Sequence, residues 1–357
     1  MGRKRVTIED VARAAGVSRQ TVSRAINDLG EISSQTRARV LRIAEEMGYR
    51  PSSIARGLAT RRTGTLGLVI PDVANPFFSD VVRGAEHVAH AQGYNVFLCN
   101  TDEDPERELA VLHSLEEKRV DGVVLCSSRL DDGKLHAVVA SHSAVVLVNR
   151  DLEPASGEAA VGVVMLDDVS GGRMATQHLL DGGHRAVGFL SGPPASRSGR
   201  CRAEGYRAAL AASGVSHNPA WTAPCPADVD GGHRAATELL TAHPELTALV
   251  CYNDLVAVGA LRACADLGRR VPADLAVVGF DDILLAALVT PPLTTCRVAR
   301  YDLGAQAMQL LLNRIAGCPA EEGPTQWERR SEEGDGHRSL CAEVVLRPEL
   351  IVRATAP

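Results

Sequence analysis

The sequence predicts a small α-helical module at the N-terminus, followed by a larger α/β body built from two lobes with parallel sheets. Three observations support this fold class. The charge changes sign along the chain, from +7 over residues 1–62 to -13 over the rest. Apolar residues between positions 7 and 47 recur at helical spacing. From Gly64 onward, short β-rich runs alternate with helical stretches, which is typical of βαβ units.

The composition excludes several classes of protein. The 357 residues are 45% hydrophobic, which is too apolar for a disordered chain and enough for two or three domains. The 9 cysteines form no CxxC pair and are odd in number, so no disulfide framework is expected. No apolar run reaches the length of about 18 residues that a membrane span needs. The basic first residues also lack the apolar core of a signal peptide, so a cytoplasmic protein without membrane contact is expected.

Residues 7–27 predict two helices joined by a tight turn. Thr7 can cap the first helix, and Gly16 ends it. Its apolar stripe consists of Ile8, Val11, Ala12 and Ala15. Ser18 then caps a second helix over about 19–27, with Val22, Ala25 and Ile26 facing inward. Two short helices joined by a turn that contains glycine form a helix-turn-helix.

A third helix is predicted over about 35–47. Either Ser33 or Ser34 caps it, and Gly48 ends it. Its inward-facing residues are expected to be Val40, Leu41 and Ala44. Three such helices suffice for a compact module of about 50 residues. The positive charge of this module indicates nucleic-acid binding, although basic termini also occur as solvated tails.

Three runs in the module are TIEDVA at 7–12, AGVSRQTVSRAIN at 15–27 and GYRP at 48–51. Together they resemble the DNA-binding headpiece of the LacI/GalR family of bacterial transcription regulators. The resemblance implies that the second helix is a recognition helix, with Arg19, Gln20 and Arg24 facing base edges in the major groove. Arginine can make two hydrogen bonds to guanine and glutamine two to adenine, which agrees with this role. A solvated helix face is the alternative interpretation of the arginines.

The same resemblance assigns further residues to DNA. The hydroxyls of the module are interpreted as helix caps and phosphate contacts, which set register without reading sequence. Residues 51–58, PSSIARGL, resemble the family's hinge helix, which forms on DNA and places Leu58 in the minor groove; a plain linker is the alternative. The expected DNA contacts are Thr7, Ser18, Arg19, Gln20, Thr21, Ser23, Arg24, Asn27, Thr36, Tyr49, Ser52, Ala55, Arg56 and Leu58.

The acidic body predicts strands that alternate with helices. Strands are expected at 66–70, 95–100, 122–126, 145–149, 161–165, 186–190, 248–252 and 275–280. Helices are expected at about 76–92, 105–118, 132–141, 168–181, 200–213, 231–242 and 254–268. This number of units fits two doubly wound lobes. In such sheets ligands bind beyond the carboxyl ends of the strands, so the residues there are the first candidates for a binding site.

Polar residues follow several of these strands. Carboxylates and amides that converge with Phe77 and Phe78 would suit a polyhydroxylated ligand such as a sugar or a nucleoside. For any single aspartate, helix capping or loop solvation is the alternative. The runs NPFF (75–78), RVDG (119–122), GHR (183–185), CYND (251–254) and VGFDD (278–282) resemble the LacI/GalR effector domain, itself similar to periplasmic sugar-binding proteins. The resemblance implies effector contacts at Asp72, Phe77, Phe78, Asn149, Arg202, Asn253 and Asp281.

The resemblance covers nearly the whole chain and implies its domains. These are a headpiece (1–50), a hinge (51–63) and an effector-binding and dimerisation domain (64–357). The N-lobe is expected at 64–166 and 295–320, and the C-lobe at 167–294 and 342–357.

Two departures from the family pattern stand out. Residues 226–230 lack the aromatic clamp of purine-responsive members, which favours a sugar-like effector and keeps a purine or nucleoside as the alternative. The segment 318–341 is longer than the usual connection and is interpreted as a surface insertion.

A nucleotide-dependent α/β enzyme is the alternative from another class of function. No GxGxxG follows the first predicted strand, and no GxxxxGK[ST], GxSxG or HExxH motif occurs, so no catalytic residue, cofactor or metal is expected. A periplasmic binding protein would lack the headpiece. The expected protein is a homodimeric transcription regulator, a repressor of carbohydrate-related genes, that binds a palindromic operator under control of a small molecule. Inducer and corepressor logic are both open.

Overall fold

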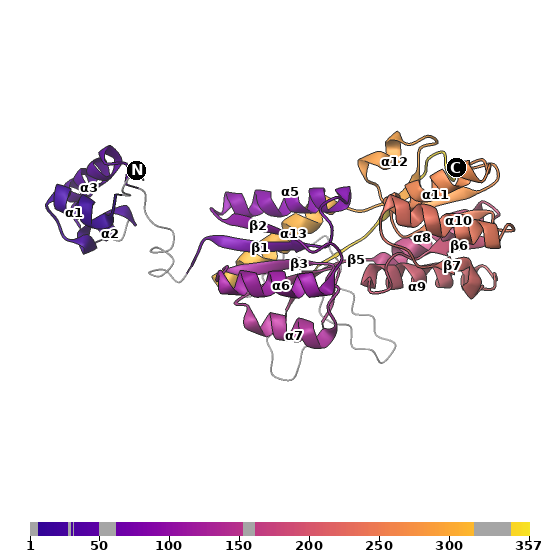
Figure 1. Ribbon diagram of the computed structural model, residues 1–357, viewed down its shortest axis with the longest axis horizontal. Coiled ribbons are helices and arrows are strands. Elements are labelled where there is room, and N and C mark those ends of the chain that lie inside the picture. Colours follow the sequence, from indigo (N-terminus) through magenta and orange to yellow (C-terminus); the bar gives the residue numbers. More distant parts are fainter. Residues whose placement is uncertain (1–5, 28–29, 31, 50–61, 153–160, 318–343) are drawn as a thin grey trace. The chain divides into compact units, whose positions relative to one another are not determined.

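The computed structural model describes residues 6–27, 30, 32–49, 62–152, 161–317 and 344–357. The chain divides into two units, Met1–Gly64 and Thr65–Pro357, called here the headpiece and the body (Figure 1). The predicted boundary between headpiece and hinge, the insertion at 318–341 and four predicted DNA contacts lie outside the described residues. These contacts are Ser52, Ala55, Arg56 and Leu58. No helix of the described segments is long and apolar enough to cross a membrane.

The first helix of the headpiece begins and ends as predicted. Helix α1 (Ile8–Ala15) starts at Thr7, whose side chain accepts the Asp10 N–H while the Asp10 carboxylate accepts the Thr7 N–H. This capping box satisfies two of the backbone donors that a helix start leaves unpaired. Gly16 ends the helix in the left-handed conformation, with φ of 63°.

Serine caps start the other two helices of the headpiece. Helix α2 (Arg19–Ile26) begins at Ser18, whose Oγ accepts the Thr21 N–H over 3.1 Å. Helix α3 (Ser34–Glu46) begins at Ser33, so Ser33 is the cap of the two serines considered. The helix-turn-helix predicted from the sequence is therefore present.

The three helices enclose one small apolar core. Its buried members are Val11, Ala12, Ala15, Val22, Ala25, Val40 and Ala44. Leu41 was expected to face inward, and this prediction is wrong, because Leu41 is 39% exposed. Val40 and Ala44, four residues apart on one face of α3, are buried in the core, and Ile43 packs against it partly buried.

The N-lobe of the body contains a six-stranded parallel sheet in the order β11-β5-β4-β3-β1-β2. Its strands are β1 (Thr65–Ile70), β2 (Asn95–Asn100), β3 (Gly122–Cys126), β4 (Val145–Val148), β5 (Gly162–Leu166) and β11 (Val344–Leu346). Alternate residues of the strands pack against different helices. One face is covered by α5 (Pro76–Ala91) and α13 (Arg300–Ala316), and the other by α6 (Pro105–Glu117) and α7 (Asp132–Ser141) (Figure 1).

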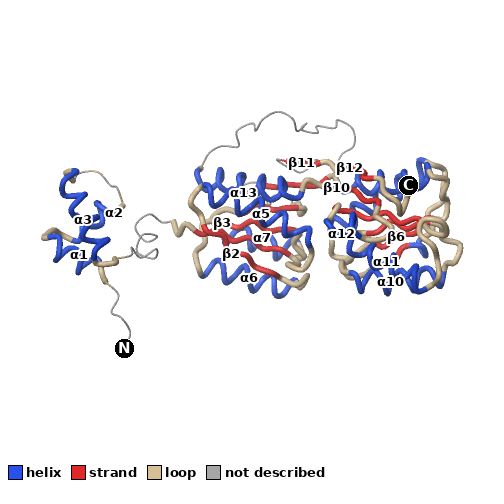
Figure 2. The backbone as a smooth tube through the Cα atoms, turned by 90° about the horizontal axis from the view of Figure 1, so that it is seen from above, coloured by secondary structure: helices blue, strands red, loops and turns tan. Residues whose placement is uncertain are grey.

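The C-lobe contains a second six-stranded sheet in the order β12-β10-β9-β8-β6-β7, parallel except for β12. Its strands are β6 (Val187–Leu190), β7 (Thr222–Ala223), β8 (Ala248–Cys251), β9 (Ala276–Asp281), β10 (Thr294–Arg297) and β12 (Glu349–Ile351). Its helices are α8 (Asp168–Asp181), α9 (Arg197–Ala212), α10 (Val229–Ala242), α11 (Asp254–Asp266) and the short α12 (Leu284–Leu288). Figure 2 shows the strands of each lobe lying among its helices. The prediction of two doubly wound lobes is confirmed.

The predicted lobe boundaries need two corrections. Strand β10 pairs with β9 in the C-lobe, although all of its residues except Thr294 were assigned to the N-lobe. Strand β11 pairs with β5 in the N-lobe, although its residues were assigned to the C-lobe. The described chain therefore crosses between the lobes after β5, after β10 and after β11. Strands of three or four residues carry too little pattern to reveal which sheet they join.

Three helix pairs approach so closely that their contacts require glycine. A Cβ built on each of these glycines would lie far inside contact distance of a backbone carbonyl oxygen on the facing helix. The glycines are Gly84 and Gly304 between α5 and α13, Gly172 and Gly205 between α8 and α9, and Gly232 and Gly259 between α10 and α11. Close approach of the helix backbones thus fixes the layers around both sheets.

Replacing Gly259 by alanine should destabilise the body, because the new Cβ would collide with the Val229 carbonyl oxygen of α10. Overpacking of this kind costs about 1–3 kcal/mol, measurable as a lower midpoint of urea unfolding. Gly133→Ala in α7 is the matched control, because the nearest atom to its Cβ is Asp131 Oδ1 at 3.4 Å. There alanine should be neutral or stabilising by up to about 1 kcal/mol. Equal effects of the two substitutions would contradict this account.

Candidate functional site

The headpiece presents a polar face on α2. Arg19, Gln20 and Arg24 are exposed, whereas Val22 and Ala25 of the same helix are buried. Gln20 and Arg24 are four residues apart and therefore lie on one face of the helix. A short helix anchored by an apolar side, with amide and guanidinium groups on its outer side, has the geometry of a helix that reads a major groove.

Several hydroxyls predicted to contact phosphate have partners within the headpiece. Ser18 Oγ lies 2.9 Å from Thr21 Oγ1, and Ser33 Oγ donates to Thr36 Oγ1 over 2.9 Å. Asn27 Nδ2 donates to the oxygen of Ser23 over 3.3 Å. Ser18 and Thr7 are confirmed as helix caps, and Tyr49 packs half-buried against the core. Contacts of all these residues with DNA stay a prediction.

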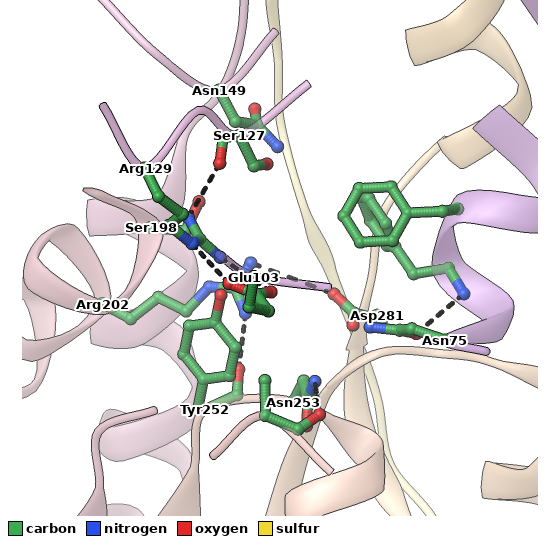
Figure 3. A pocket seen from close by; sticks show the side chains of 13 residues that line it. Asn75, Glu103, Ser127, Arg129, Asn149, Ser198, Arg202, Tyr252, Asn253 and Asp281 are labelled. Carbon is green, nitrogen blue, oxygen red and sulfur yellow. Dashed lines mark hydrogen bonds and ion pairs between the residues drawn. The ribbon is translucent and has the colours of Figure 1, made fainter. Parts of the chain in front are cut away.

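The body contains a pocket between the carboxyl ends of the two sheets (Figure 3). Its volume is about 370 Å³, including the opening to solvent. From the N-lobe it is lined by Asn75, Phe77, Phe78, Glu103, Ser127, Arg129 and Asn149, and from the C-lobe by Ser198, Arg202, Ala227, Tyr252, Asn253 and Asp281. Both lobes thus contribute polar groups to one cavity, as expected for a ligand site in doubly wound sheets.

Six of the seven predicted effector residues line this pocket. They are Phe77, Phe78, Asn149, Arg202, Asn253 and Asp281. Asp72 does not line it; its Oδ1 accepts the N–H of Ala74 over 2.8 Å and so shapes the turn before α5. Whether these residues contact an effector stays a prediction.

Sequence reasoning missed the other pocket residues. Ser127 and Tyr252 directly follow β3 and β8, so the rule of searching beyond strand ends could have found them. Glu103 and Arg129 come from two different loops and are brought together by the fold. Pattern within the sequence carries no signal for that pairing.

Arg202 is held in the C-lobe wall by several partners. Its Nε donates to Asp168 Oδ1 over 2.8 Å, its Nη1 donates to the carbonyl of Tyr252 over 2.5 Å, and its Nη2 lies 3.9 Å from Asp281 Oδ1. The guanidinium carbon is 3.5 Å from the centre of the Phe280 ring. With only 4% of its surface exposed, this charge is balanced by two buried carboxylates and an aromatic face.

Two buried carboxyls near this arginine have raised pKa values. Burial raises the pKa of Asp281 to about 7, although Arg202 and Arg300 act in the opposite direction. Asp281 can therefore gain or lose a proton near neutral pH. Burial, with the nearby Asp281 charge, also raises the pKa of Asp254 well above its usual value. Asp254 accepts hydrogen bonds from Thr295 Oγ1 at 2.6 Å and from the N–H of Ile283 at 2.8 Å, so it fastens α11 to neighbouring segments of the C-lobe.

Arg129 organises the N-lobe wall. Its Nε and Nη2 donate to the two carboxylate oxygens of Glu103 over 2.5 and 3.0 Å, and its Nη1 donates to the carbonyl of Ser127 over 3.0 Å. Buried Glu108 accepts the backbone N–H of Arg129 over 2.9 Å, so α6 holds this loop in place. Burial would lower the pKa of Arg129, but Tyr252 and Glu103 together outweigh it and raise that pKa. Arg129 thus interacts with a C-lobe residue across the cleft.

Backbone strain is concentrated at the pocket. Over the described ranges, seven residues other than glycine have a positive φ. Four of them line the pocket: Glu103 at 59°, Ser127 at 49°, Asn149 at 53° and Asp281 at 108°. Each such conformation costs about 1–3 kcal/mol and persists where the surroundings hold it, often at a ligand site.

The pocket combines hydrogen-bond donors, acceptors and two aromatic side chains. Phe77 and Phe78 pack edge to face, with ring centres 5.0 Å apart. This mixture suits a polar organic ligand that has several hydroxyl or amide groups. Over the part of the chain that the structure describes, no group of three or more His, Cys, Asp or Glu side chains is placed to hold a metal ion.

Two family models match the chain. The model described as bacterial regulatory proteins of the lacI family matches residues 7–52, which include all three headpiece helices. The model described as periplasmic binding proteins and sugar binding domain of the LacI family matches residues 63–340.

Curated relatives match over nearly the full chain. The HTH-type transcriptional repressor PurR of Haemophilus influenzae (strain PittEE) is 34% identical over 97% of each chain. The ribose operon repressor of Halalkalibacterium halodurans is 35% identical over 93% of this chain and 98% of its own.

Solved structures show the same architecture. The complex of the transcriptional regulator CelR with cellobiose is 32% identical, with a TM-score of 0.69 over 98% of this chain and all of its own. The lac repressor dimer bound to operator and the anti-inducer ONPF is 28% identical, with a TM-score of 0.81 over 99% of each chain. These matches are to transcriptional regulators and not to enzymes. The family models and the relatives together show that this chain is a member of the LacI family of DNA-binding transcriptional repressors.

Proposed function

We propose that this repressor binds a palindromic operator as a homodimer and is controlled by a sugar-like effector in the pocket between its lobes. The observation that carries the proposal is the pocket itself, where strand ends of both lobes bring charged, strained and aromatic residues together. Binding there responds to the relative position of the lobes. An effector can shift a protein only toward the arrangement that it binds better.

The lining of the pocket favours a sugar over a purine. Ala227 lines the pocket. It lies in the segment where purine-responsive members of the family carry an aromatic clamp, and its own side chain is only a methyl group. Glu103, Arg129 and Asn149 place oxygen and nitrogen atoms on the opposite wall, suited to hydroxyl groups. The complex of CelR with cellobiose and the ribose operon repressor support this reading, while the PurR relatives keep a purine or nucleoside as the second candidate.

Exposed apolar residues support a homodimer. In the N-lobe, Phe97 and Leu98 on the edge strand β2 are each 44% exposed. In the C-lobe, Leu284 and Leu288 on α12 are 74% and 66% exposed. In each lobe two exposed apolar side chains lie on one element, which agrees with an association surface, and a matching lac repressor structure is a dimer. We assign both surfaces to the dimer interface, so that a movement of the lobes repositions the two headpieces.

In the proposed complex, each headpiece reads one half of a two-fold symmetric site. Gln20 and Arg24 contact base edges, and the headpiece hydroxyls contact phosphates. Leu58 enters the minor groove at the centre, as the family resemblance implies, although it lies outside the described residues. We accordingly expect the protein in the bacterial cytoplasm, and at the nucleoid when it is bound to DNA. Release from DNA by the effector and tightening on DNA are both compatible with this mechanism.

Arg24→Ala should relax base preference at one position of each half-site, because a bidentate arginine discriminates between bases by about 1–3 kcal/mol. Competition binding against a set of single-base variants of the operator measures this change. Arg39, exposed on α3, supplies the control. Arg39→Ala should change affinity for all sequences alike. If both variants lost affinity uniformly, α2 would not be the reading helix.

Asp281→Asn should raise the effector concentration that gives a half-maximal change in operator affinity by about tenfold or more, since it replaces a buried carboxyl group of the pocket with an amide. Fluorescence anisotropy of labelled operator, with a panel of sugars, sugar phosphates, nucleosides and purine bases, measures the response. Operator affinity without effector should stay within about twofold. Asp230→Asn, at an exposed position on α10, is the control. An unchanged response of the Asp281 variant would contradict the assignment.

A comparison of Asp281→Asn with the wild type should also show how the protonation of Asp281 affects folding stability. The pKa of Asp281 is about 7 in the folded chain and about 4 when unfolded, so the folded state retains the proton longer. Stability that depends on this proton is therefore lost as pH rises from about 4 to about 7. The melting temperature of Asp281→Asn, relative to that of the wild type, should therefore rise as pH increases across this window and stay constant above it. A difference that stays constant from pH 5 to pH 8 would speak against it.

A further inference from the structure

One ion pair joins the two lobes beside the pocket. Arg197, the first residue of α9 in the C-lobe, donates from Nε to Asp151 Oδ1 over 2.8 Å. Asp151 follows β4 in the N-lobe, and the two side chains are 22% and 32% exposed. Among side-chain ion pairs within the described ranges, this pair alone connects the lobes; the others connect residues of a single lobe or of the headpiece.

Both partners are charged in this arrangement. Burial would raise the pKa of Asp151, but the hydrogen bond and the positive charge of Arg197 outweigh burial and lower it. Arg150 adds a second positive charge, with its Nη1 3.8 Å from Asp151 Oδ1. The pair is therefore an ionic contact at neutral pH, set in a partly buried position where salt screens it less than on an open surface.

The position of the pair ties it to the pocket walls. Asn149, two residues before Asp151, lines the N-lobe wall, and its Oδ1 accepts the N–H of Leu166 over 3.0 Å. Ser198, the residue after Arg197, lines the C-lobe wall. Any change in the separation of Asp151 and Arg197 thus changes the separation of the two walls.

Separate side-chain contacts lie next to the segment that crosses between the lobes after β10. Arg300 follows the crossing after β10 and begins α13. It pairs with Asp80 on α5 over 2.9 Å and donates to the backbone carbonyls of Asp281 and Asp282. These contacts join the start of α13 and α5 to the end of β9, next to the crossing. Arg197 and Asp151 belong to no crossing segment, so a rotation of the lobes about the crossings must stretch or break their contact.

We infer that Arg197 and Asp151 are positioning residues for the effector pocket: their ion pair holds the two walls at a set separation before any effector is present. This inference concerns the control of the pocket and rests on the proposed function. The chain itself supplies part of the interaction that keeps the lobes together. Loss of the pair lets the lobes open, which reduces the fraction of molecules ready to bind a ligand and weakens its apparent affinity by that fraction.

Interlobe distances in the full-length, effector-free protein test the inference. Glu117 and Glu238, both exposed, are replaced by a noncanonical amino acid that carries a nitroxide label. Pulsed electron paramagnetic resonance then reports the distance between α6 and α10. Labelled chains are diluted with unlabelled chains, so that distances within one protomer dominate. Arg197→Gln removes the charge and Arg197→Lys keeps it. Arg262→Gln, which breaks an exposed ion pair with Asp230 inside the C-lobe, is the matched control.

The wild type, Arg197→Lys and Arg262→Gln should share one narrow distance distribution. Arg197→Gln should increase the longer-distance population about two- to fivefold, the range expected for one ion pair. Asp151→Asn should reproduce that increase. A broad wild-type distribution, an unchanged Arg197→Gln distribution or an equal change in Arg262→Gln would each overturn the inference. Operator binding is measured on the same samples, so a failure of the proposed function is seen separately from these distances.

Discussion

Arg202 and its two buried carboxylates are the interaction on which the pocket side of the C-lobe depends. The guanidinium joins Asp168 on α8 to Asp281 at the end of β9, and it also binds the backbone after β8. Three separate elements therefore meet at one side chain carried by α9. This meeting needs the close approach of α8 and α9, where a Cβ at Gly172 would strike the carbonyl oxygen of Arg202 itself. The charge arrangement of the pocket therefore depends on the tight packing of α8 against α9.

Such a cluster is not explained by stability alone. Burying an arginine and two carboxylates has a large desolvation cost, which well-packed apolar residues would avoid. The strained backbone at Asn149, Ser127, Glu103 and Asp281 adds to that cost. Because the buried charges and the strained backbone occur at the same pocket, we infer that the pocket is organised to recognise a ligand. The raised pKa of Asp281 follows from the same burial, and it lets this carboxyl act as a donor or as an acceptor near neutral pH.

Local signals predicted much of the fold, and their absence explains what was missed. The Thr7 cap and the Gly16 stop locate α1, because both act within a few residues of the helix ends. Helix α13 was not predicted, since its N-cap residue, Ala299, offers no side-chain cap and the helix contains Gly304. The partners of β10 and β11 depend on where distant segments cross between lobes. Strand length gives no indication of such crossings.

The pocket residues likewise fall into those that local sequence rules predict and those that depend on distant contacts. Asn253 and Asp281 lie at the ends of their strands, so a rule about parallel sheets finds them. Arg129 reaches the pocket only because Glu103 and the loop fixed by Glu108 hold it there. The contact between Asp151 and Arg197 depends on how two lobes are set against each other. Interactions between distant loops therefore mark the limit of what sequence pattern predicts.

The central claim is that the basic headpiece reads DNA for a body that senses a small molecule. Selection of a randomised duplex library on the purified protein, followed by sequencing of the retained duplexes, tests it most directly. We expect an enriched motif with two half-sites related by two-fold symmetry and a flexible pyrimidine-purine step at the centre. Absence of any enriched motif, both without and with pooled metabolites, would contradict it.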